Sequence, residues 1–244
     1  MMAALATGLG ALPIIFLNKV SDKTTDLLMG FSAGVMLAAS FVSLLQPGLE
    51  QFSTMFSTLN SAIFSGVSVL LGGLVVHWLH QLLPHTHLTK ENDVKINVKL
   101  SKTWLLVFAI GLHNLPEGFA VGVGVGSTDP DLGLSIATGI SLQNIPEGLV
   151  VGLALFANGY SKLKSILIAF LTGMVEPICA APGYLFVTQI ATLLPWALCF
   201  AAGAMVYVIS HEMIPESHSR GYEKQATAGV LIGTVVMMSL NLLI

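Results

Sequence analysis

Two short segments of the same pattern carry the polar residues that could do chemistry in this chain. They read HNLPEG at 113–118 and QNIPEG at 143–148. In each segment the first and fifth residues are four apart, so in a helix they lie on one face. Imidazole, carboxylate and amide groups suit zinc and neighbouring first-row metals, and two glutamates can bridge two ions. The candidate metal ligands are His113, Asn114, Glu117, Gln143, Asn144 and Glu147.

Prolines inside both segments favour the same chemistry. Pro116 and Pro146 each remove a backbone donor and push away a carbonyl one turn earlier, which kinks a helix and frees that oxygen for a cation. The competing interpretation is a hydrogen-bonded polar cluster that only holds the helices together. Such a cluster explains one Asn or Gln, but it does not explain a His with two Glu.

Other polar residues within apolar segments extend the candidate site. Glu176 lies next to a proline, as the glutamates of the two segments do, although it precedes its proline and they follow theirs. Pro215 has His211 and Glu212 before it and Glu216 and His218 after it, which predicts an exit station for the ion, although a solvated helix end explains Glu216 and His218 nearly as well. Met36 could donate a thioether, but a lone methionine in an apolar helix more often belongs to the core.

The surrounding chain predicts the elements that must position these residues. Of 244 residues, 54% are hydrophobic and 9% are charged, and the mean hydropathy is +0.82. A membrane-spanning helix needs about 20 apolar residues, so we expect one all-α membrane domain over 1–244. The eight expected helices are about 1–18, 27–47, 60–83, 103–126, 132–157, 163–190, 195–214 and 226–244. At about 1.5 Å per residue, His113 and Gln143 both fall near the bilayer midplane.

Basic residues predict the topology. They lie only in the odd-numbered loops between these helices, at Lys19, Lys23, Lys90, Lys95, Lys99, Lys102, Lys162, Lys164, Arg220 and Lys224. Because such residues stay on the cytoplasmic side, both termini should face outside. The even loops hold Glu50, Asp129 and Asp131, which would make the outer mouth negative, or which are ordinary solvated acids.

The third loop adds a further group of histidines. His85 and His87 lie in it, and His77 and His80 lie one turn apart at the end of the preceding helix. They would collect metal weakly, or they are plain interfacial histidines. Cys179 and Cys199 lack the spacing of a metal cluster or a disulfide framework, so we interpret them as structural thiols.

An internal repeat is predicted as well. Residues 31–36 resemble residues 200–205, and each segment is followed by a proline and an acid. The two helices would run in opposite directions. We therefore expect a 3+2+3 arrangement in which helices 1–3 and 6–8 form an inverted repeat, as in many transporters.

The paired segments, the eight helices and the histidine-bearing third loop together resemble the ZIP family of metal transporters, near its prokaryotic GufA-like branch. The resemblance implies import of Zn²⁺ into the cytoplasm, with Fe, Mn, Co and Cd as alternatives, by an elevator in which helices 1, 4, 5 and 6 slide against the rest. It implies a binuclear site with Glu176 and Met36 added to the residues above, and an inner-mouth site with His211 and Glu212. Many relatives have His where this chain has Gln143, and some have an acid at Asn144.

Two other functions stay open at this point. A metal or proton channel would use the same carboxylates, whereas a metalloenzyme would need a second histidine where the chain has Pro215. We expect no enzyme and no catalytic cofactor, since the metal ion is bound as a substrate. The expected partners are divalent metal ions and the lipid bilayer of the cell membrane, without nucleic acid, and a homodimer stays open.

Overall fold

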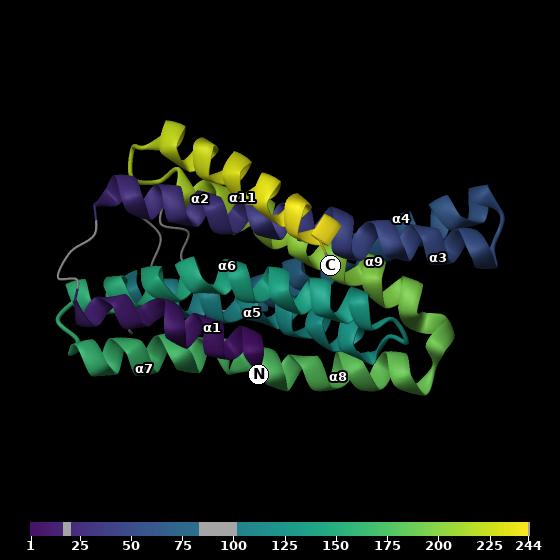
Figure 1. Cartoon of the computed structure of the whole chain (residues 1–244), viewed down its shortest axis with the longest axis horizontal. Helices are drawn as coiled ribbons and strands as arrows, with labels where there is room; N and C mark the ends of the chain where they lie inside the picture. Colours follow the sequence, from purple (N-terminus) through teal and green to yellow (C-terminus); the bar gives the residue numbers. More distant parts are fainter. Residues whose placement is uncertain (17–20, 83–101, 244) are drawn as a thin grey trace.

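The structure is a computed structural model that describes residues 1–16, 21–82 and 102–243, apart from the side chains of residues 82, 102, 103, 105, 106 and 109. All elements in these residues are helices, and Figure 1 shows them in two layers. The lower layer consists of α1 (Met2–Ala11), η1 (Leu12–Ile15), α5 (Lys102–Gly126), α6 (Pro130–Ala157), α7 (Lys162–Gly173) and α8 (Val175–Gln189).

The upper layer contains the remaining helices. It consists of α2 (Asp22–Ala38), η2 (Ala39–Leu45), α3 (Gln46–Met55), α4 (Thr58–Leu82), η3 (Ala191–Leu193), α9 (Leu194–Val208), η4 (Ile209–Met213), α10 (Ile214–Ser217) and α11 (Glu223–Leu243). Within this layer α2 packs along α11 and α4 packs along α9, while in the lower layer α1 packs along α6 and α5 along α8. Each layer is thus built from two tight helix pairs.

The lengths of the helices confirm an all-α membrane protein of about eight helices. Six stretches in the described residues are long and apolar enough to span a bilayer: Asp22–Met55, Thr58–Gln81, Pro130–Ala157, Lys162–Gln189, Ala191–Ser217 and Glu223–Leu243. With 25 residues, α5 has the length for another. The first helix is shorter than the expected 1–18, because it covers only Met2–Ile15, about 21 Å at about 1.5 Å per residue.

The structure also changes two expected boundaries. The helix expected at 163–190 is two helices that meet at Met174. The helix expected to end near residue 47 continues to Met55, because the π-helix η2 precedes Pro47 and lets the chain pass it without ending the helix. A second π-helix, η4, precedes Pro215 in the same way.

The packing of equivalent glycines agrees with the expected repeat. Gly34 in α2 lies against the backbone of Val230 in α11, and Gly203 in α9 lies against the backbone of Val69 in α4. A Cβ at either glycine would overlap that neighbouring backbone, so only glycine allows these helices so close. In Figure 1, α2 runs from left to right while α9 runs from right to left. The matching parts therefore have opposite directions.

Candidate metal site

The candidate ligands of the lower layer are buried together in its interior. The exposed fraction of each residue is 4% or less for His113, Asn114, Glu117, Gln143, Asn144, Glu147 and Glu176. They come from the middle of α5, the middle of α6 and the start of α8. Charged and polar groups in the membrane-spanning part of a protein are costly, so they stay where a function requires them.

Hydrogen bonds join these residues across the helices. The Gln143 Nε2 donates to Glu117 Oε1 at 2.7 Å, which links α6 to α5. The Asn144 Nδ2 donates to Glu176 Oε1 at 2.6 Å and so links α6 to α8. The polar faces of α5 and α6 therefore confront each other, and Glu176 lies beside them.

Six of these seven candidate ligands, all except Glu147, nevertheless have a buried polar atom without a hydrogen-bond partner. Within the described residues, the buried atoms in this condition are His113 Nδ1, Asn114 Oδ1, Glu117 Oε2, Gln143 Oε1, Asn144 Oδ1, Ser165 Oγ and Glu176 Oε2. All but the serine oxygen belong to the candidate ligands. The amides donate their N–H groups to the protein and leave their carbonyl oxygens unpaired, which is the form in which an amide can ligate a cation.

The acidic and imidazole groups do not by themselves form a complete set of ligands. Among the described residues, no three or more His, Cys, Asp or Glu side chains are arranged to hold one metal ion. An ion at this place would therefore also need the amide oxygens of Asn114, Gln143 and Asn144. The donor set is then mostly oxygen with one imidazole, which zinc and other first-row metals accept.

Glu212 lies closer to the central residues than its position near a helix end suggests. One carboxylate oxygen of Glu212 pairs with His113 Nε2, and the other pairs with His80 Nε2. Glu212 belongs to η4 in the upper layer, so this contact crosses between the layers. We expected Glu212 at a separate exit station, and the structure instead connects it directly to His113.

Two further histidines, His77 and His211, lie near His80 at the end of α4. The ring of His211 lies 4.9 Å from that of His80, measured between centroids, and 5.1 Å from that of Tyr207. His77 Nδ1 lies 2.9 Å from the hydroxyl of Tyr207. His80, which we treated as a weak collector of metal, thus lies next to both residues of the expected inner-mouth site, and His77 contacts the neighbouring Tyr207.

In the upper layer, α2 contributes one residue that we expected and one that we missed. Met36 is completely buried and lies in the main hydrophobic cluster. Ser32, one turn earlier on the same helix, donates a hydrogen bond to Glu147 Oε1 at 2.6 Å. Nothing in the local sequence distinguishes this serine from other serines of apolar helices.

The acids expected at the outer mouth line a single cavity. Glu50, Asp129 and Asp131 surround a space of about 400 Å³ together with Ser43, Ser135 and Asn241. Asp129 also caps α6, because its side chain accepts hydrogen bonds from two backbone N–H groups. The cavity is therefore polar and carries negative charge, as a mouth that gathers cations should.

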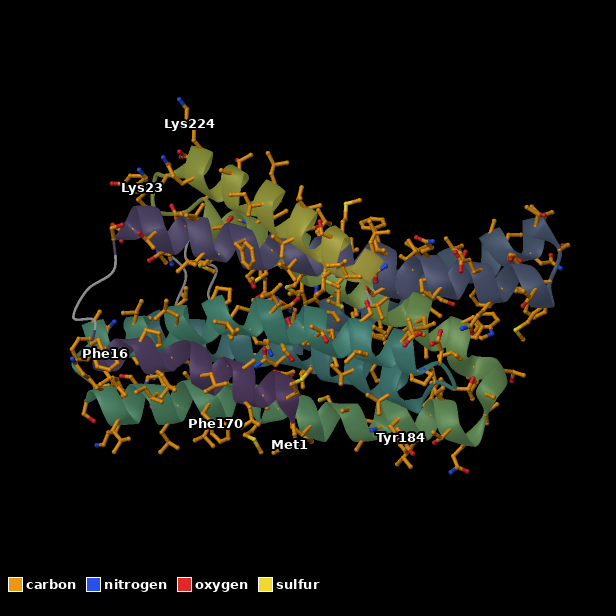
Figure 2. The ribbon with its side chains drawn as sticks, viewed as in Figure 1. Met1, Phe16, Lys23, Phe170, Tyr184 and Lys224 are labelled. Atoms are coloured by element: carbon orange, nitrogen blue, oxygen red, sulfur yellow. The ribbon has the colours of Figure 1, made fainter. Side chains whose placement is uncertain are left out.

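The described basic residues lie at the opposite end from this cavity. Figure 2 shows Lys23 and Lys224 at one end of the molecule, where α2 and α11 begin. Lys162 begins α7 at this end too (Figure 1).

The described cysteines are free thiols, Cys179 half-buried and Cys199 buried. Outside the described residues or side chains lie Lys19, His85, His87, Lys90, Lys95, Lys99 and Lys102.

Comparison with known proteins agrees with this arrangement. The model of the family described as ZIP Zinc transporter matches residues 84–241. The chain is 44% identical to the zinc transporter GufA of Myxococcus xanthus over 243 residues, which cover 99% of the chain and 96% of that relative. It is 39% identical to the zinc transporter ZIPB of Bordetella bronchiseptica, covering 97% of the chain and 77% of the relative. It is 30% identical to the zinc transporter ZIP11 of Homo sapiens, covering 96% and 93%.

Proposed function

The chain belongs to the ZIP zinc transporter family, and from this premise we propose that it imports Zn²⁺ into the cytoplasm through the buried site of the lower layer. Membership of this family makes the chain a transporter of divalent metal and not an enzyme. The observation that carries the proposal is the group of unpaired, metal-ligating atoms buried at mid-length of α5 and α6. Fe, Mn, Co and Cd ions remain candidate substrates, because the same donors accept them.

The proposed site is binuclear. Glu117 and Glu147 would bridge two ions, and the remaining ligands would come from His113, Asn114, Gln143, Asn144 and Glu176. Hydrogen bonds already hold one oxygen of Glu117 and one of Glu176, and each keeps its second oxygen unpaired. Met36 would add a thioether from the upper layer.

The proposed mechanism is an elevator in which the lower layer slides against the upper layer. Packing within each layer supports it, because helices there meet backbone to backbone at glycines. In the lower layer, Gly118 lies against the backbone of Glu176 and Gly148 against that of Thr7. Between the layers, a Cβ at Gly139 would meet side chains and no backbone among its nearest atoms: the flexible end of Met237 and, farther away, the Cβ of Ala39. Contacts within a layer are thus rigid, while this contact between layers can yield.

The proposed route follows the charges of the molecule. Cations would gather in the acidic cavity around Glu50 and Asp131, bind in the lower layer, and leave past Glu212, His80 and His211. The end that carries Lys23 and Lys224 would face the cytoplasm of the cell, and both termini would point outside. The paired contacts of Glu212 with His113 and His80 give the ion successive ligands along this path.

Zinc uptake into proteoliposomes tests the proposal. We expect saturable uptake by the intact protein and uptake at the background level for the Glu117→Ala, Glu147→Ala double variant. The matched control is Glu223→Ala, which removes an exposed acid at the first turn of α11. Uptake by the double variant equal to that of the control would exclude the buried site as the route.

A further inference from the structure

Ser32 reaches from the upper layer into the proposed metal site. Its side chain is completely buried, and its Oγ lies 2.6 Å from Glu147 Oε1 and 3.1 Å from the backbone oxygen of Gln143. Ser32 belongs to α2, whereas both of its partners belong to α6. Ser32 therefore makes a direct hydrogen bond between the two layers at the site.

The geometry indicates which of the two oxygens accepts the hydrogen bond of the Ser32 hydroxyl. A serine hydroxyl has one proton to donate. An O–H···O bond to a carboxylate is typically 2.5 to 2.7 Å and is stronger than one to a neutral carbonyl. The shorter contact, to Glu147, fits this range. The donation fixes one oxygen of Glu147 and with it the orientation of the carboxylate.

We propose that Ser32 is a positioning residue for the metal site and that it acts by orienting Glu147 for the ion. This inference rests on the proposed role of Glu147 as a ligand. Partners that orient a metal ligand typically change metal affinity 10- to 100-fold when they are removed. Because the contact joins α2 to α6, it also ties the orientation of Glu147 to the position of the lower layer. Sliding of that layer would break the hydrogen bond.

A serine in a buried helix can instead have a purely structural role. Ser40 provides that case in the same span, because it is equally buried but donates to its own helix, to the backbone oxygen of Met36 at 2.7 Å. Such a bond to the preceding turn is common for serine in helices and reaches no ligand side chain. Ser40→Ala is therefore a matched control for Ser32→Ala.

Titration of the purified full-length protein with Zn²⁺ tests the inference. We expect Ser32→Ala to raise the dissociation constant about tenfold, and Ser40→Ala to change it less than about twofold. In a Glu147→Ala background, Ser32→Ala should have no further effect, since residues that act through one another are not additive. In uptake assays, Ser32→Ala should raise the half-saturating zinc concentration more than it lowers the maximal rate.

The possible contrary results have different meanings. Equal zinc affinities of Ser32→Ala and Ser40→Ala would overturn the positioning role alone. A full tenfold loss from Ser32→Ala in the Glu147→Ala background would overturn it too, because the serine would then act by another route. If Glu147→Ala itself bound zinc like the unaltered protein, the proposed ligand set would fail, and the inference would fail with it.

Discussion

In the lower layer, α5, α6 and α8 bury carboxyl and amide groups that keep unpaired atoms, whereas the upper layer pairs both oxygens of a completely buried carboxylate. That carboxylate is Asp26, which accepts from Arg220 Nη1 and from the backbone N–H of Tyr222, each at 3.2 Å. Within the described residues, every buried side-chain atom without a partner belongs to the lower layer. The two layers thus differ in hydrogen-bond satisfaction although both are apolar overall.

The difference has an energetic meaning. A buried polar group without a partner typically costs about 1 to 3 kcal/mol, and a charged group costs more. Native proteins keep few such groups, and several in one place indicate a ligand. The upper layer has the properties of a stable support, while the lower layer has those of a carrier whose stability is completed by a cation. Each prediction below tests one part of this contrast.

The largest expected effect is that of Glu117→Gln, which should change metal binding and stability in opposite directions. Loss of the carboxylate should weaken zinc binding by about 100-fold or more, beyond what loss of an orienting partner causes. The same change removes a buried charge with an unpaired oxygen, so the metal-free protein should unfold at an equal or higher temperature. Zinc titration and thermal unfolding in detergent measure the two effects, and a clear drop in the unfolding temperature would break the contrast.

Asp26→Asn in the upper layer should lower the stability of the protein and leave its zinc affinity almost unchanged. An amide in place of the carboxylate offers only one oxygen to two donors, Arg220 Nη1 and the backbone N–H of Tyr222, so we expect the free energy of unfolding to fall by about 1 to 3 kcal/mol. Zinc affinity should stay within about twofold. Glu216→Gln is the matched control, because Glu216 also pairs with Arg220 but is partly exposed, and its loss should cost less than about 1 kcal/mol. A large change in zinc affinity for Asp26→Asn would show that the layers do not divide these roles.

Gly118→Ala should damage the lower layer by packing alone. A Cβ at Gly118 would overlap the backbone of Glu176, so we expect a loss of about 1 to 3 kcal/mol and weaker zinc binding as Glu176 is displaced. Gly111, two turns earlier on α5, has open space at the same point, and Gly111→Ala should stabilise the helix by up to about 1 kcal/mol. Thermal unfolding measures the stability of the two variants. If both variants lost similar stability, the effect of Gly118→Ala could not be attributed to the close packing of α5 against α8.

Much of the lower layer could be predicted from the sequence, because local periodicity decides it. The repeated segments 113–118 and 143–148 carry their spacing in themselves, and a four-residue spacing places side chains on one face whatever surrounds the helix. The apolar stretches likewise predicted the spans to within a few residues, except where the local backbone changes. The break at Met174 and the short first helix depend on packing between helices, which composition does not reveal.

The contacts between layers could not be predicted in this way. Glu212 and His113 are far apart in the chain, and packing of α9, which leads into η4, against α5 brings them together. Ser32 in α2 and Ser40 in η2 are both buried serines of one span, yet Ser32 bonds to a candidate ligand and Ser40 to the preceding turn of its own span. Their partners depend on the rotation of α2 relative to α6, and the sequence of α2 does not contain that information.

The smallest expected effect concerns the acidic cavity where the layers meet, at the end opposite Lys23 and Lys224. Its acids would raise the local concentration of cations without binding them tightly, so the Glu50→Gln, Asp131→Asn double variant should slow zinc uptake only about two- to threefold at low ionic strength. At about 1 M salt the Debye length falls to about 3 Å, and the difference should disappear. Asp129 is left in place because it caps α6. Glu223 is an exposed acid at the other end of the molecule, and Glu223→Gln should leave zinc uptake unchanged at either salt concentration. If the slower uptake persisted at high salt, the cavity would hold the ion directly. The ion would then have a second binding site between the two layers, and binding would not be confined to the lower layer.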